Sequence, residues 1–144
     1  MIEKDTVRLL RECDAGIQMG VDSLNTVLPH VKSQQLKDLL TDSKERHLEL
    51  DRELRILLDR YGDEGKDPNP MLQGMSKLKT EFKLNIRPTD AAIADLITEG
   101  CHMGVKSLYR YLNQYQAADE ESKTITKKIA SLEEELLQHL RPYL

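Results

Sequence analysis

A thirteen-residue segment of this chain occurs twice, and the repeat strongly constrains the fold. Residues 16–28 are GIQMGVDSLNTVL and residues 100–112 are GCHMGVKSLYRYL, so seven of the thirteen positions are identical. Each copy lies in a long pattern with helical spacing and is followed by a second such pattern, which weakly matches its counterpart at an offset of 86. Self-similarity of this kind indicates two helical hairpins related by duplication.

The composition favours charged amphipathic helices. Hydrophobic residues make up 39% of the chain and charged residues 32%, with one Phe and no Trp. A chain of 144 residues suits one domain with its own core. We therefore expect a single all-α domain over residues 1–144.

Charge and apolar patterning exclude several classes of partner. The net charge is −4, and basic residues alternate with acidic ones, so no basic surface forms for nucleic acid. No apolar run is long enough for a membrane span or signal peptide, which predicts a cytoplasmic protein without a membrane partner. Cys13 and Cys101 form no Cys-x-x-Cys motif, and we expect both to be buried rather than redox-active.

The first hairpin is predicted over residues 3–61. Its first helix runs to Leu28 and ends at Pro29. Ser33 can cap the second helix, and Gly62 supplies its C-terminal stop. Apolar residues recur three or four positions apart along the first helix, as an amphipathic helix requires.

The second hairpin is predicted over residues 89–142. Thr89 can cap the third long helix, and an acidic segment beginning at Asp119 opens the fourth, which Pro142 ends. The connection over 62–88 is rich in Gly, Pro and Asn and contains a short predicted helix over 71–84. Such a connection can carry the chain back along the bundle, which makes the second and third long helices parallel.

Two segments resemble the ferritin-like superfamily, and in particular an uncharacterised bacterial branch of it. The first is Cys13-Asp14-Ala15-Gly16, and the second is Thr98-Glu99-Gly100-Cys101 with Met103 and Tyr109 after it. The resemblance implies a four-helix bundle with one long crossover.

The metal ligands of ferritin-like di-iron proteins are incomplete in this chain. Those sites need Glu-x-x-His on two helices and one Glu on each of the others. Lys44 stands three residues before His47, and Leu136 three before His139; the only Glu-x-x-His joins Glu99 to His102. The repeat aligns Ile17 and Cys101 where single carboxylates would stand. We therefore expect no ferroxidase centre, no catalytic residue and no cofactor.

Two polar residues interrupt the apolar seams of the first hairpin. Asp14 and His47 are nearly equidistant from Val31 in the first turn, so equal rise predicts a buried hydrogen-bonded pair at mid-bundle. The structural interpretation is a remnant of a lost site. The alternative adds Cys101 and Glu133 to form a mixed site for iron, manganese or zinc.

Other features have a structural and a functional interpretation. The pairs Gly16/Gly20 and Gly100/Gly104 predict either tight helix contacts or room for a ligand. The tyrosines at 109, 111 and 115 cover a core end or bind a partner. The charge runs over 45–53 and 133–135 are expected to face solvent and pair within their helices.

No catalytic motif is present, so two functional hypotheses remain. The first is a metal-free interaction or stress-associated module. The alternative is a degenerate metal-binding or redox protein. We also expect a homodimer, because some apolar residues are predicted to face outward: Val27, Leu39, Leu58 and Leu137.

Overall fold

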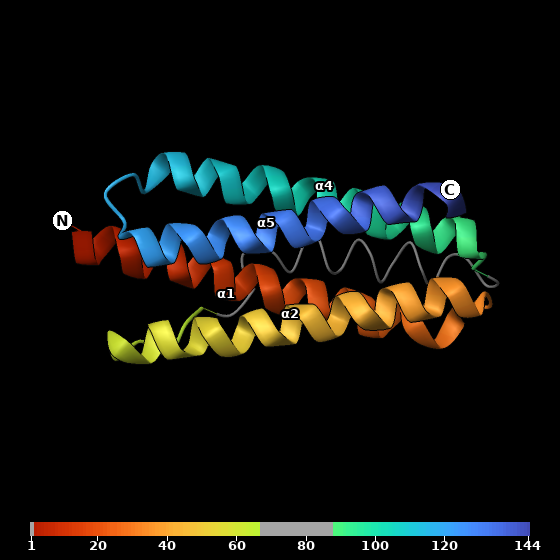
Figure 1. Cartoon of the computed structure of the whole chain (residues 1–144), viewed down its shortest axis with the longest axis horizontal. Coiled ribbons are helices and arrows are strands. Elements are labelled where there is room, and N and C mark those ends of the chain that lie inside the picture. The colour runs from red at the N-terminus through yellow and green to blue at the C-terminus, as the bar shows by residue number, and fades with distance from the viewer. Residues whose placement is uncertain (1, 67–87) are drawn as a thin grey trace.

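The structure is a computed structural model that describes residues 2–66 and 88–144. It contains four long helices, which are α1 (Ile2–Val27), α2 (Gln34–Arg60), α4 (Asp90–Gln114) and α5 (Glu120–Leu140). Two short 3₁₀ turns follow α1 and α5, namely η1 (Leu28–His30) and η3 (Arg141–Tyr143). The described residues contain no strand, and the prediction of an all-α four-helix bundle is confirmed (Figure 1).

The helices α2 and α4 run in the same direction, as the loop lengths predict. Figure 1 shows α1 running away from the N-terminus, α2 returning, α4 running parallel to α2, and α5 returning again. The two hairpins pack side by side, with α2 against α5 and α1 against α4. The short helix predicted over 71–84 lies outside the described residues.

The predicted capping residues start the helices. The Ser33 hydroxyl accepts a hydrogen bond from the Leu36 amide at 3.3 Å, and the Thr89 hydroxyl accepts one from the Ala92 amide at 3.1 Å. The Asp119 carboxylate accepts the Ser122 amide at 2.8 Å, so it caps α5 from outside the helix. Beyond α2, Gly62 has a φ of +63°, the left-handed conformation expected of a helix stop.

The core consists of two separate apolar clusters. The first apolar cluster fills the end of the bundle that contains the α1–α2 connection, the start of α4 and the end of α5; its buried members are Leu24, Val27, Leu36, Leu40, Ile93, Ala94, Ile97, Cys101, Leu136 and Leu140. The second apolar cluster fills the other end; its buried members are Leu10, Cys13, Ile17, Leu54, Leu58, Leu108, Ile125, Ile129 and Ala130. Both cysteines are buried and free, as predicted.

The four apolar residues that were predicted to face outward are all buried or partly buried. Val27 and Leu58 are fully buried, because each faces a core cluster, so this prediction is wrong for both. Leu39 and Leu137 are partly buried against the first apolar cluster. The large apolar side chains that are exposed are instead Ile56, Met103, Tyr109 and Leu144.

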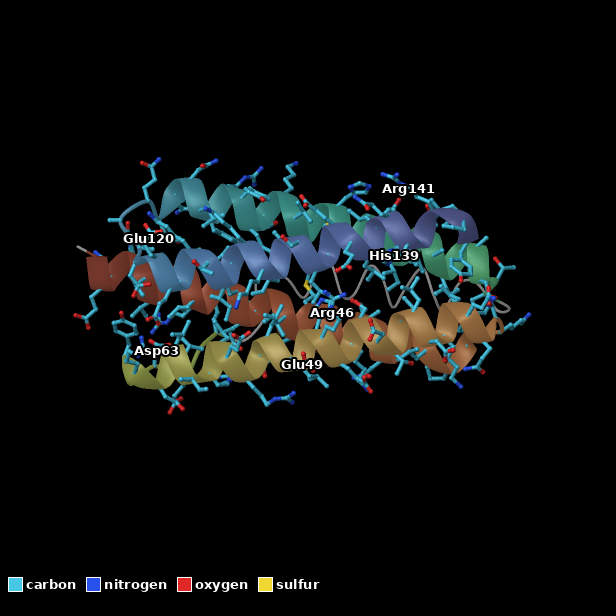
Figure 2. All side chains as sticks on the ribbon, viewed as in Figure 1. Arg46, Glu49, Asp63, Glu120, His139 and Arg141 are labelled. Atoms are coloured by element: carbon cyan, nitrogen blue, oxygen red, sulfur yellow. The ribbon has the colours of Figure 1, made fainter. Side chains whose placement is uncertain are left out.

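Ion pairs among the described residues join neighbouring helices. Arg46 on α2 binds Glu135 on α5 at 2.8 Å, and Lys128 on α5 reaches Glu53 on α2 at 3.5 Å. Figure 2 shows Arg46 near the middle of the bundle's length, between these two helices. Such half-exposed pairs contribute little stability but fix which residues of α2 and α5 lie at the same height. None of the described helices is both long and apolar enough to span a bilayer.

Candidate functional site

Glycines and polar side chains separate the two apolar clusters at mid-length of the bundle. The first cluster extends inward to Leu24, Leu40, Cys101 and Leu136, and the second begins at Ile17, Leu54, Leu108 and Ala130. Between these limits, one glycine in each hairpin faces a buried ionisable side chain on the neighbouring helix. We call these four residues the central layer: Gly20, His47, Gly104 and Glu133.

Contacts between the hairpins place the central layer at one height. The ion pair between Arg46 and Glu135 brings the neighbouring positions 47 and 133 of α2 and α5 level. The amide of Lys32 donates to Asp90 at 2.9 Å, and the two glycines lie twelve and fourteen residues from that contact. At 1.5 Å per residue, Gly20 and Gly104 therefore lie within about one helical turn of each other along the bundle.

His47 is an uncharged imidazole that packs on Gly20. Its Nδ1 lies 2.7 Å from the carbonyl oxygen of Ser43, which can only accept, so Nδ1 donates; in the uncharged ring Nε2 then keeps the lone pair. A Cβ atom at Gly20 would lie 3.2 Å from both Cδ2 and Nε2. Burial lowers the pKa of His47, which outweighs the hydrogen bond to Ser43 that raises it.

Glu133 is the corresponding group of the second hairpin and is 7% exposed. Its Oε2 is buried without a hydrogen-bond partner. A Cβ atom at Gly104 would lie 2.8 Å from the Glu133 Cδ and closer still to Oε2, so the carboxyl group occupies the space that the glycine leaves. Burial raises the pKa of Glu133 to about 8, and the expectation that it faces solvent is wrong.

The two buried cysteines are inert thiols. Burial, with a smaller effect of Glu133, raises the pKa of Cys101 far above its ordinary value. Burial also raises the pKa of Cys13 to about 12, although its sulfur lies 3.2 Å from the Thr126 hydroxyl. Reactive cysteines need the thiolate, so neither is set up as a nucleophile.

The predicted hydrogen bond between Asp14 and His47 does not form. Asp14 is 1% exposed, and it accepts hydrogen bonds from the side chains of Gln18 and Arg55 and from the Lys66 amide, at 3.0, 2.6 and 2.9 Å. The 3₁₀ turn η1 carries the chain further along the direction of α1 before it reverses. The midpoint between residues of α1 and α2 that lie at the same height is therefore beyond Val31. Gly20 therefore lies opposite His47, and Asp14 lies two turns away.

Asp14 instead fastens the chain that follows α2. Arg55 bridges it to this segment by donating to the Glu64 carbonyl at 2.8 Å. Lys66 adds an ion pair to Glu12, and Asp63 adds one to Arg11 at 2.7 Å. Asp63 lies at the end of the bundle where α2 finishes (Figure 2). We call residues 63–66 the docked segment.

The residues present do not fit a di-metal centre. Glu133 acts electrostatically on Cys101, but Asp14 is bonded to Arg55, so the four candidates Asp14, His47, Cys101 and Glu133 do not converge. No group of three or more His, Cys, Asp or Glu side chains within 2–66 and 88–144 is arranged to hold a metal ion. Glu99, His102 and His139 are exposed.

The paired glycines do not serve a close approach of two helix backbones. Gly20 and Gly104 make room for the side chains of His47 and Glu133, so the prediction of backbone contact is wrong for these two. No atom of a described residue lies within 4 Å of a Cβ placed at Gly16 or Gly100.

The tyrosines near the end of α4 divide between two environments. The rings of Tyr111 and Tyr115 stack with their centres 6.3 Å apart, whereas Tyr109 is 44% exposed. Tyr109 therefore keeps its ring available for a contact outside the chain.

Comparisons with known proteins gave no match to this chain. No family model matches the chain, and neither a curated protein nor a solved structure matches it significantly.

Proposed function

We propose that the chain is a ferritin-like bundle formed by duplication of a helical hairpin. The parallel course of α2 and α4 supports this, since ferritin-like bundles have one long crossover. The central layer supports the duplication. Gly20 and Gly104 are 84 residues apart, as the repeated segments are, and His47 and Glu133 are 86 apart, the offset of the weaker match between the second and fourth helices.

We propose that this bundle is a metal-free module for interaction or stress response and not an enzyme. The observation that carries the proposal is the carboxylate of Asp14, which is already paired with the Arg55 cation and hydrogen-bonded by the Lys66 amide. Glu133 is uncharged near neutral pH, and metal sites require deprotonated ligands. The buried, unpaired thiols of Cys13 and Cys101 suit a cytoplasmic location, where thiols stay reduced.

Metal analysis tests this function directly. Protein purified without chelator should contain iron, manganese and zinc far below one ion per chain. Asp14 is already paired with Arg55, and Glu133 is protonated, so neither carboxyl group is free to bind a metal ion. Elemental analysis by mass spectrometry measures the content. Near-stoichiometric metal would contradict the proposal.

The alternative remains a degenerate metal or redox protein, and one observation favours it. Glu133 Oε2 is buried without a partner, and its charge acts on the pKa of the buried Cys101 thiol, so these are the two groups that an ion would recruit. Under this alternative, metal present in the wild type would be lost in Glu133→Gln and kept in the variant of its exposed neighbour, Glu134→Gln.

We propose further that the chain forms a homodimer through α4. Met103 and Tyr109 on this helix are 55% and 44% exposed, so α4 carries two of the exposed large apolar side chains of the described residues, whereas α2 carries one, Ile56. Sedimentation at tens of micromolar, where a standard interface is populated, should give twice the chain mass of 16.6 kDa. Met103→Glu should shift the protein to the monomer, whereas Ile56→Glu on α2 should not. A monomeric wild type would contradict the dimer.

A further inference from the structure

We propose that the central layer is a proton-linked switch: α4 and α5 stay closely packed while Glu133 carries a proton, and they separate locally when it loses that proton. The proposal starts from the fit between Glu133 and Gly104. The carboxyl group fills the space of a missing Cβ, so it lies between two helix backbones with its Oε2 unpartnered. A carboxylate without hydrogen bonds in such a place is strongly unfavourable.

The ionisable groups around Glu133 supply no counter-charge. On α4 the neighbour is the Cys101 thiol, which is neutral. On α2 the groups at this height are His47, which is an uncharged imidazole, and Arg46, which binds Glu135 at the surface. On α1 the same height is occupied by Gly20, and Asp14 is bonded to Arg55 two turns away. Ionisation of Glu133 therefore requires contact with water.

The glycine is part of the switch. An interior helical glycine is less favourable than alanine, and glutamine would fill the same space as Glu133 without becoming charged. The chain therefore combines an interior helical glycine with a buried glutamate at one place, and buried ionisable groups with shifted pKa values cluster at functional sites. Movement of the Glu133 side chain from Gly104 into water releases the proton and removes the contact of Glu133 with α4 at Gly104.

Amide hydrogen exchange between pH 5 and 9, corrected for the intrinsic pH dependence of exchange, tests the switch. An opened Glu133 ionises at its ordinary pKa of 4.5, whereas the closed one holds its proton to about 8. The opening equilibrium of amides near Gly104 and Glu133 should therefore rise about tenfold per pH unit between these values and level off above them. Amides of α1 and α2 should change little.

Three variants separate the proton from other causes. Glu133→Gln should give a flat profile, whereas Glu134→Gln at an exposed neighbour should reproduce the wild type. Gly104→Ala should also be flat, because its Cβ forces the carboxyl group out while keeping Glu133 in the sequence. A pH-dependent profile in Glu133→Gln, an equal rise across all four helices, or an ordinary Glu133 pKa by carbon NMR would overturn the proposal.

Discussion

Replacing Asp14 by alanine is expected to lower the free energy of unfolding by about 2–4 kcal/mol. The carboxylate is buried and accepts three hydrogen bonds, two of them from groups outside α1, so its removal leaves the Lys66 amide unsatisfied and Arg55 without its anion. The guanidinium group of Arg55 is partly exposed and recovers some hydration, which keeps the loss below that of a fully buried ion pair. Urea denaturation at pH 7 measures the change.

Asp22→Ala is the matched control, because Asp22 is exposed on the same helix and should change the stability by less than about 0.5 kcal/mol. The loss from Asp14→Ala should add to that from His47→Ala, since the two side chains share no partner. A loss below about 1 kcal/mol for Asp14→Ala, or strong coupling to His47, would show that the hydrogen bonds of Asp14 do not stabilise the fold as described.

The helices and their ends could be predicted from the sequence because their signals are local. Ser33 and Thr89 cap their helices through contacts with residues three positions away, and the positive φ of Gly62 follows from its place just beyond a helix. The direction of α4 was also predictable, since it depends on loop length rather than on side chains.

The predicted pairing of Asp14 with His47 was wrong because it depended on the geometry of the turn between α1 and α2. Which residues of two antiparallel helices lie at the same height depends on where the chain reverses direction. The 3₁₀ turn Leu28–His30 moves this reversal a few residues along the chain. Two turns of helix separate the predicted and the observed neighbours of Asp14. Its actual partners, Arg55 and Lys66, depend on the path of the docked segment, which no helical period indicates.

Glu133 is a different case, because the sequence carried a usable signal. It lies four residues after Ile129 and three before Leu136, which are both buried, so helical spacing places it on the apolar seam. Its position in a run of three glutamates favoured a solvated face, but within that run Glu134 is exposed, Glu135 is half-exposed and Glu133 is buried. Spacing is the better guide here, since burial follows the helix face and not the neighbouring residue types.

Gly65→Ala is expected to lower the free energy of unfolding by about 2–3 kcal/mol. Gly65 has a φ of +90°, which strains any side chain, and a Cβ there would lie 3.0 Å from the Asp14 Cγ and 3.1 Å from the Arg55 Nη1. Asp14 cannot move aside without breaking its hydrogen bonds. The docked segment should detach instead, and the Lys66 amide should exchange faster while the helical circular dichroism stays unchanged.

Gly62→Ala separates backbone strain from the loss of docking. Gly62 also has a positive φ, of +63°, but no atom of a described residue lies within 4 Å of a Cβ placed there. Its replacement should therefore cost only about 1 kcal/mol and leave the exchange of the Lys66 amide as it is. Equal losses for Gly62→Ala and Gly65→Ala would mean that strain alone acts at both glycines. A larger loss at Gly65 that disappears in an Asp14→Ala background would instead locate it in the contact between the docked segment and Asp14.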